Sequence, residues 1–125
     1  MEFSKTVDVS RNLVYVKCSG ELIIDEFLEQ MNQIEEDPLF DIKMNILTDF
    51  SKMTIKKDYS VIVKLILYVL KDGPRHKGCK WALVYPETID QSMIRLYEAI
   101  SNYLDLLSQS FTTSEEAEAW VLDSH

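Results

Sequence analysis

The chain has 125 residues, the size of one domain, and 46% of them are hydrophobic while 27% are charged. Only 3 glycines and 3 prolines occur, which excludes a collagen-like or low-complexity chain and is typical of a globular fold. The formal net charge of −8 weighs against nonspecific nucleic-acid binding, because such binding depends on basic side chains that neutralise phosphates. We therefore predict one domain over residues 1–125 that binds no nucleic acid.

The first predicted elements form a β-hairpin. Apolar and polar residues alternate over 3–9, the turn-forming residues 10–12 follow, and a second strand covers 13–18 and ends at Gly20. A helix is predicted over 24–36, because its apolar residues recur at helical spacing and Asp37-Pro38 stops it.

The next elements alternate strictly between strand and helix. A third strand is predicted over 44–49, followed by a loop and then by a helix over 59–71 that Asp58 caps. A buried strand over 81–85 precedes a long helix over 89–107, and residues 108–111 form a short connection or edge strand. Thr113 and Glu116 have the spacing of a capping box, which predicts a last helix. This order predicts an α/β fold with about five strands, mostly parallel, an antiparallel N-terminal strand and about four helices.

The helix over 59–71 is unusually apolar. Nine of the ten residues from Val61 to Leu70 are hydrophobic, with Lys64 the exception, although a helix on one face of a sheet needs only one apolar side. We expect some of Ile62, Leu65, Ile66 and Val69 to face away from the sheet, where the long helix 89–107 or a twofold partner covers them. Packing as ordinary core remains the competing interpretation.

Charge is unevenly distributed along the chain. Residues 52–80 carry a net charge of +6, whereas the segments on either side each carry −7. These basic residues are either solvated surface or a patch for an anionic ligand, partner or lipid surface. The candidate basic patch consists of Lys52, Lys56, Lys57, Arg75 and Lys77.

The sequence shows no pattern typical of an enzyme or a metal site. Cys18 and Cys79 form no C-x-x-C pair, so free thiols in a reducing compartment are expected, and Cys79 has only His76 nearby. Asp49 and Asp58 are the only plausible pair of catalytic acids, but backbone hydrogen bonding by Asp49 and helix capping by Asp58 are the favoured explanation. We predict no catalysis, no cofactor and no metal. Because no apolar run reaches membrane-spanning length and the N-terminus lacks a signal-peptide core, a cytoplasmic location is expected.

Four stretches in order along the chain resemble one family. They are Gly20-Glu21-Leu22 with the acidic helix start and the break at 36–40, the strand end Leu47-Thr48-Asp49, the run 81–84 followed by 93–98, and the tail with Phe111, Ala117, Trp120 and Val121. Together they resemble the SpoIIAA-like family of STAS-related proteins, also described as STAS/CRAL-TRIO-like. The resemblance implies a compact α/β domain that acts as a regulatory or binding module rather than as an enzyme.

The resemblance also bears on phosphoregulation and ligands. In the related anti-sigma-factor antagonists, a strand ends in Asp-hydrophobic-Ser, which Asp49-Phe50-Ser51 matches, and a phosphorylatable Ser follows at a helix start. Asp58 stands at about that switch position here, so the phosphoserine signature is missing. The CRAL-TRIO side of the resemblance points to apolar or lipid ligands.

Two functions therefore remain open from the sequence. The first is a noncatalytic regulatory or protein-interaction module whose partner is another protein or a second copy of itself. The alternative is a carrier or sensor of a small apolar or anionic-lipid ligand, working at the membrane surface or away from it. The residues we predict to bind the ligand or partner are Asp49, Ser51, Asp58, Tyr59, Ile62, Ile66, Met93 and Tyr97.

Overall fold

The hairpin predicted at the start of the chain is present. The structure is a computed structural model that describes residues 1–76 and 78–123. Strand β1 (Glu2–Asp8) pairs antiparallel with β2 (Leu13–Glu21). The Asp8 carboxylate fixes the turn between them, since its Oδ1 accepts hydrogen bonds from Ser10 Oγ at 2.8 Å and from the Arg11 amide at 3.2 Å. β2 continues past the predicted end at Gly20, which adopts a φ of +87° that favours glycine.

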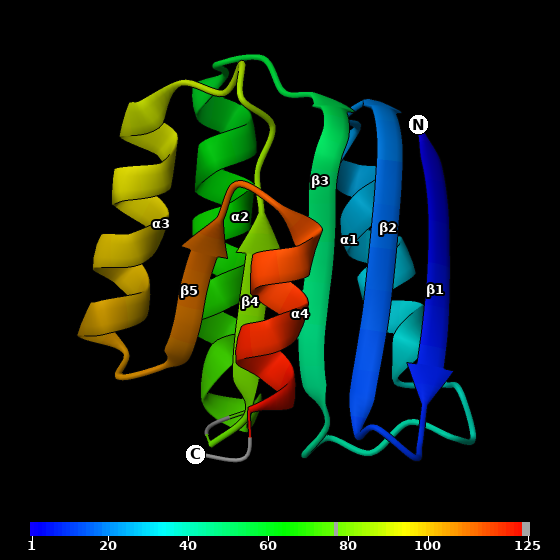
Figure 1. The fold of residues 1–125 in the computed structure, drawn as a ribbon. Helices are drawn as coiled ribbons and strands as arrows, with labels where there is room; N and C mark the ends of the chain where they lie inside the picture. Colours follow the sequence, from blue (N-terminus) through cyan, green and yellow to red (C-terminus); the bar gives the residue numbers. More distant parts are fainter. Residues whose placement is uncertain (77, 124–125) are drawn as a thin grey trace.

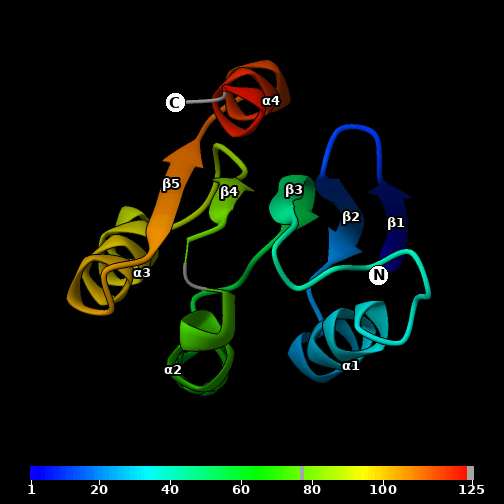
Figure 2. The ribbon, with the colours of Figure 1, turned by 90° about the horizontal axis from the view of Figure 1, so that it is seen from below.

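The predicted α/β architecture is confirmed. Strands β3 (Asn45–Thr54), β4 (Lys80–Val84) and β5 (Leu107–Phe111) follow β2 in parallel, in the spatial order β1-β2-β3-β4-β5. Right-handed crossovers between successive neighbouring strands place their helices on the same face. Accordingly α1 (Ile24–Ile34), α2 (Tyr59–Asp72) and α3 (Gln91–Tyr103) lie on one side of the sheet (Figures 1 and 2).

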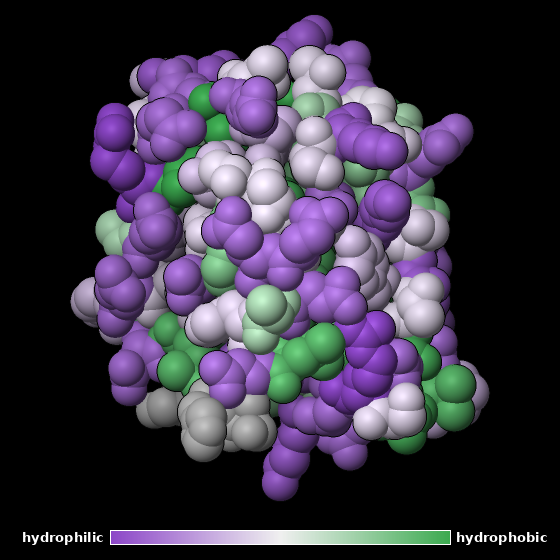
Figure 3. All heavy atoms as spheres, in the orientation of Figure 1, coloured by the Kyte–Doolittle hydropathy of each residue, from purple (hydrophilic) through white to green (hydrophobic). Residues whose placement is uncertain are grey.

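The opposite face of the sheet is covered by the C-terminal helix α4 (Ser114–Leu122), which packs mainly over β3 and β4 (Figure 1). Each face has its own apolar core. Phe27, Met31, Val16, Ile46 and Phe50 belong to the core on the α1 side, and Leu13, Leu47, Val84, Ala117 and Val121 belong to the core under α4. Seen from the α4 side, the surface is mostly hydrophilic with small, separated apolar areas (Figure 3).

Strand β3 is longer than the predicted strand 44–49, and its extension contains a bulge. The parallel register shifts between the Lys17–Asp49 and Ser19–Lys52 pairs, so β3 has one extra residue opposite β2. The shift keeps Phe50 and Met53 on the same face although they are three residues apart. It also places Lys52 within a strand, where the sequence had predicted a loop.

Helix α3 ends four residues earlier than the predicted helix 89–107. Asp105 has a φ of +55°, and the amides of Asp105 and Leu106 bond to the carbonyls of Asn102 and Ser101. This is the Schellman arrangement, which ends a helix with one residue in the left-handed region. Glycine usually occupies that position, so the stop at Asp105 was not visible in the helical spacing. Residues 107–111 are thereby free to form β5, the edge strand.

Side-chain caps begin three of the helices: those at Asp58 and Thr113 were expected from the sequence, whereas the third, Asp90, lies inside the helix predicted over 89–107. Asp58 Oδ1 accepts from the Ser60 amide at 2.8 Å, and Asp90 Oδ1 accepts from the Ser92 amide at 2.8 Å. Thr113 Oγ1 accepts from the Glu116 amide at 3.3 Å. Each side chain satisfies a backbone N–H that the first helical turn leaves unpaired.

The cap of α2 gives a direct test of this local structure. Because Ser and Asp cap helices about equally well, Asp58→Ser should leave the free energy of unfolding almost unchanged. Asp58→Ala should lower it by about 1 kcal/mol, since alanine cannot accept the Ser60 amide. Urea unfolding of the two variants measures the difference, and equal stabilities would show that α2 does not depend on this cap.

Candidate binding site beneath helix α2

Helix α2 is the most apolar helix of the fold, yet it is shallowly buried. In the shorter α1, Ile24, Phe27, Met31 and Ile34 are fully buried, whereas Val69 is the only apolar residue of α2 in that state. A helix that is hydrophobic on every side normally lies inside a protein. The fold therefore leaves apolar surface unburied on both the inner and the outer side of α2.

Two adjoining apolar cavities lie on the inner side of α2. One, of about 70 Å³, lies between α2, α3 and the sheet, and the other, of about 100 Å³, lies between α2, α1 and the sheet. For comparison, an engineered apolar cavity of roughly 150 Å³ stays dry and binds benzene. The two cavities share the lining residues Phe50, Leu65, Val69, Leu83 and Tyr97.

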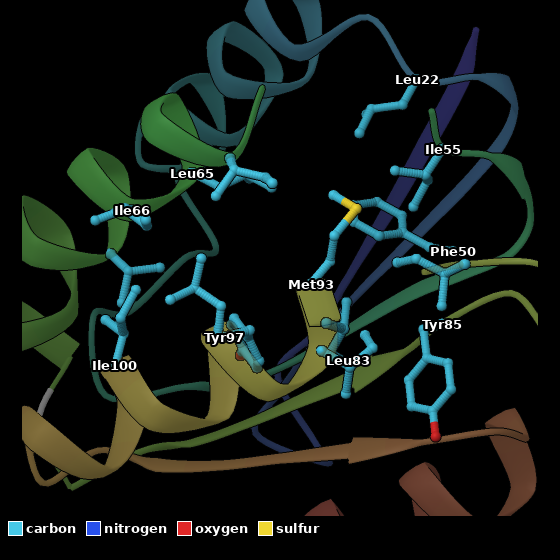
Figure 4. A pocket seen from close by; sticks show the side chains of 15 residues that line it. Leu22, Phe50, Ile55, Leu65, Ile66, Leu83, Tyr85, Met93, Tyr97 and Ile100 are labelled. Atoms are coloured by element: carbon cyan, nitrogen blue, oxygen red, sulfur yellow. The ribbon is translucent and has the colours of Figure 1, made fainter. Parts of the chain in front are cut away.

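Side chains from several elements converge on the cavity beside α3. Leu65 and Ile66 approach it from α2, and Met93, Tyr97 and Ile100 approach it from α3 (Figure 4). The hydroxyl groups among the lining side chains belong to Tyr85 and Tyr97, and that of Tyr97 is 2.5 Å from Ser108 Oγ on β5 and so is already hydrogen-bonded. Burial raises the pKa of Tyr97, so its hydroxyl stays protonated at neutral pH. The cavity therefore offers dispersion contacts and almost no polar recognition.

At each end of this cavity, residues next to α2 contact residues next to α3. Ile55 and Ile89 line one end, and beyond them Lys57 Nζ lies 3.3 Å from Asp90 Oδ2, which links the segments that precede the two helices. At the other end, Gly73 lies close to Leu106, since a Cβ at position 73 would be 2.9 Å from Leu106 Cδ1, the tip of a flexible side chain. The helices are thus tied together at their ends while the space between them and the sheet stays partly open.

The outer side of α2 carries an exposed apolar stripe. Tyr59, Val63, Leu67 and Leu70 expose 75%, 52%, 60% and 43% of their surface and recur at helical spacing. Ile62, Leu65, Ile66 and Val69, which the sequence expected the long helix or a twofold partner to cover, all line the cavity beside α3. Because α3 lies alongside α2, the side of α2 left uncovered is the one that carries Tyr59, Val63, Leu67 and Leu70.

The other predicted binding residues are not part of this cavity. Asp49 is 3% exposed and lies on the α4 side of the sheet, where it accepts hydrogen bonds from the Ser51 amide at 2.9 Å and from the Tyr15 hydroxyl at 3.4 Å. The carboxylate thereby holds the backbone at the bulge of β3. Asp58 caps α2 on the opposite face, so the two acids do not form a catalytic pair. Ser51 is exposed on β3.

The four residues of the candidate basic patch that the structure describes do not all lie together. Lys56 pairs with Glu21 at 3.0 Å, Lys57 with Asp90, and Arg75 with Glu35 at 3.1 Å. Lys52 lies on β3, and Arg75 follows the far end of α2, which is about 20 Å long at 1.5 Å per residue. Lys77 lies outside the described residues.

The cysteines are free and buried, as predicted. Burial, with a smaller contribution from the Asp49 charge, raises the pKa of Cys18 to about 12. Burial also raises the pKa of Cys79, whose thiol donates to the Ile42 carbonyl at 3.4 Å. Since the thiolate is the nucleophilic form, both side chains are poor nucleophiles at neutral pH.

Two further features are metal-binding clusters and membrane-spanning helices. Within residues 1–76 and 78–123, no group of three or more His, Cys, Asp or Glu side chains is arranged to hold a metal ion. Over the same part of the chain, none of the helices combines the length and the hydrophobicity needed to cross a bilayer.

Sequence reasoning identified Ile62, Ile66, Met93 and Tyr97, and the structure brings these four together around one cavity. It missed Phe50 and Leu83, the residues of the sheet that line both cavities. Leu83 could have been found, because it alternates with Ala82 and Val84 in a strand and so faces the α2 side. Phe50 could not, because the bulge of β3 sets its surroundings.

Comparison with known proteins leaves the family of this chain open. No protein-family model matches the sequence, and no curated protein matches it either. The resemblance to SpoIIAA-like proteins therefore remains an interpretation of the sequence.

The ion pair at the end of the cavity predicts a pH dependence. Hydrogen bonds from Ser92, with a smaller contribution from Lys57, lower the pKa of Asp90 from 3.8 to about 2. A carboxyl with a lowered pKa stabilises the fold above its unfolded pKa and loses that contribution as the pH falls through its folded pKa. Stability should therefore decrease between pH 3.8 and about 2.

Asp90→Asn separates this effect from general acid unfolding. Asparagine still caps the helix but does not titrate, so the variant should lose less stability than the wild type across that pH range. Urea unfolding at a series of pH values measures both profiles. Identical slopes in the two proteins would show that Asp90 makes no contribution of this kind.

Proposed function

We propose that this protein is a noncatalytic binding module of the STAS-like type and that α2 is its binding element. The observation that carries the proposal is the pair of apolar cavities beneath α2, which adjoin each other and share five lining residues. Apolar pockets of this kind are the usual place where proteins hold small molecules. The ligand class that fits is a small, largely hydrocarbon molecule or chain, because the lining offers almost no polar partner.

The geometry favours an elongated apolar ligand over an anionic lipid. The two cavities share five lining residues beneath α2, and we propose that a single chain extends from one into the other. In contrast, three of the basic residues that could hold an anionic head group already face carboxylates. Occupation by an apolar ligand removes hydrocarbon surface from water, which stabilises by roughly 25 cal/mol for each Å² buried.

A second candidate function is a regulatory protein-interaction module, and the outer stripe of α2 favours it. Monomeric proteins rarely leave a contiguous apolar stripe bare, and such a surface usually marks an interface. This function and ligand binding use opposite sides of the same helix. The two are therefore compatible in one protein.

We also propose that the protein is not a catalyst and that it is cytoplasmic. Asp49 and Asp58 are engaged at the β3 bulge and at the start of α2, and both thiols are held protonated by burial. These contacts give each of the reactive groups a structural role. Two free, buried cysteines suit a reducing compartment such as the cytoplasm.

Calorimetric titration with decanol tests the ligand proposal. Decanol should bind the wild type with a negative change in heat capacity, the mark of apolar burial. Val69 lines both cavities, so Val69→Phe should fill the shared space and abolish binding. Thermal melting of this variant checks that it remains folded.

A matched control is available on the same helix. Val63→Phe makes the identical substitution on the exposed outer side of α2, and it should bind decanol as the wild type does. Failure of the wild type to bind, or binding by a folded Val69→Phe variant at wild-type affinity, would count against a ligand site in these cavities.

A further inference from the structure

The two cavities beneath α2 differ in how far they reach toward solvent. Among the described residues that line either of them, Leu96 on α3 is the one that is exposed, at 38%, and it lines the cavity beside α3. Ile62 and Ile66 on α2 and Ile100 on α3 line the same cavity and are half-buried, and Ile66 and Ile100 flank it from the two helices (Figure 4). This cavity therefore reaches the surface at Ile62, Ile66, Leu96 and Ile100, which we call the α2–α3 seam.

The cavity beside α1 is enclosed on its far side. Phe27 and Met31 of α1 line it there and expose only 4% and 8% of their surface. Lys64 Nζ on α2 lies 2.7 Å from Asp25 Oδ1 on α1, and this ion pair bridges the two helices. Every described residue that lines this cavity is buried or half-buried. The space beside α1 is therefore an inner chamber, and the residues that the two cavities share place it next to the cavity that reaches the surface.

Hydration decides which end of a ligand lies inside. A polar group moved from water into an apolar space without a new hydrogen bond costs free energy, and an ionised group costs far more. No charged side chain is among the described residues that line the two cavities, so a hydrated head group would find no counter-charge there. At the α2–α3 seam the same head group stays in water. A hydrocarbon chain gains by extending inward, because each CH₂ buried away from water raises the affinity about fourfold.

We propose that the ligand is a single-chain amphiphile whose head group stays at the α2–α3 seam and whose chain extends beneath α2 into the inner chamber, to end against Phe27 and Met31. The proposal rests on the ligand-binding function proposed above and adds the class and the orientation of the ligand. The inner chamber then sets the chain length that the site accepts. Thr48 lines this chamber from β3 and is not among the residues that line the cavity beside α3, so it is a position that determines chain-length specificity.

Decyl glucoside tests where the head group lies. Its chain is that of decanol, but its sugar is larger than benzene, which binds in a cavity of roughly 150 Å³, so cavities of about 70 and 100 Å³ are too small to enclose it. Below the concentration at which it forms micelles, decyl glucoside should bind the wild type within about tenfold of decanol, because the same chain is buried. It should also compete with decanol in calorimetric titration. The cavity-filling variant Val69→Phe should bind neither, and Val63→Phe should bind both.

Thr48→Met tests where the chain ends. The flexible methionine should fill part of the inner chamber and weaken the binding of decyl glucoside by about tenfold or more. Hexyl glucoside, whose shorter chain stays in the cavity beside α3, should bind this variant as it binds the wild type. Thr54→Met is the matched control, since it makes the same substitution at an exposed position of β3 and should bind both glucosides with wild-type affinity. Met31→Phe narrows the same chamber from α1 and takes the place of Thr48→Met if thermal melting shows that the latter does not fold.

The outcomes separate this proposal from the ligand site itself. A wild type that binds decanol but not decyl glucoside would overturn the proposal and leave the ligand site standing, because the head group would then lie inside. Equal loss of hexyl and decyl glucoside binding in folded Thr48→Met or Met31→Phe, or no loss of either, would overturn it as well. Failure of the wild type to bind either decanol or decyl glucoside would contradict both the orientation and the ligand site.

Discussion

The constraint on which the rest of this structure depends is the position of α2, an apolar helix seated on a sheet that cannot cover it. Sequential strand order and right-handed crossovers place α1, α2 and α3 in one layer, with α2 in the middle. Its neighbours cover its flanks, but its inner side rests over two cavities and its outer side faces solvent. Every proposed binding property follows from this arrangement.

The polar groups of the protein have a different role, which is to fix the backbone around α2. Asp49 holds the bulge of β3, Asp58 begins α2, and Asp90 begins α3 while it pairs with Lys57. At the opposite end of α2, Gly73 lies close to the Leu106 side chain. The chain thus uses its acids to position apolar surfaces, which is the reverse of an active site, where a scaffold positions reactive groups.

Much of the fold could be predicted from the sequence, because periodicity and capping are local properties. The hairpin, the caps at Asp58 and Thr113, and the parallel order of the later strands all followed from such patterns. The early end of α3 and the bulge of β3 did not, since neither has a glycine to mark it. Which side of α2 stays exposed depends on where α3 packs, and this is set by the tertiary structure. The sequence could therefore predict some of the residues that line the cavity, but not which side of α2 stays exposed.

Amide hydrogen exchange of α2, with and without decanol, tests most directly whether α2 is a loosely seated binding helix. Shallow burial predicts that α2 amides exchange through local opening, faster than those of the central strand β3. Filling the cavities should then slow exchange in α2 and leave β3 unchanged. If α2 is as protected as β3 without decanol, and decanol leaves its exchange unaltered, α2 is ordinary core and not a binding element.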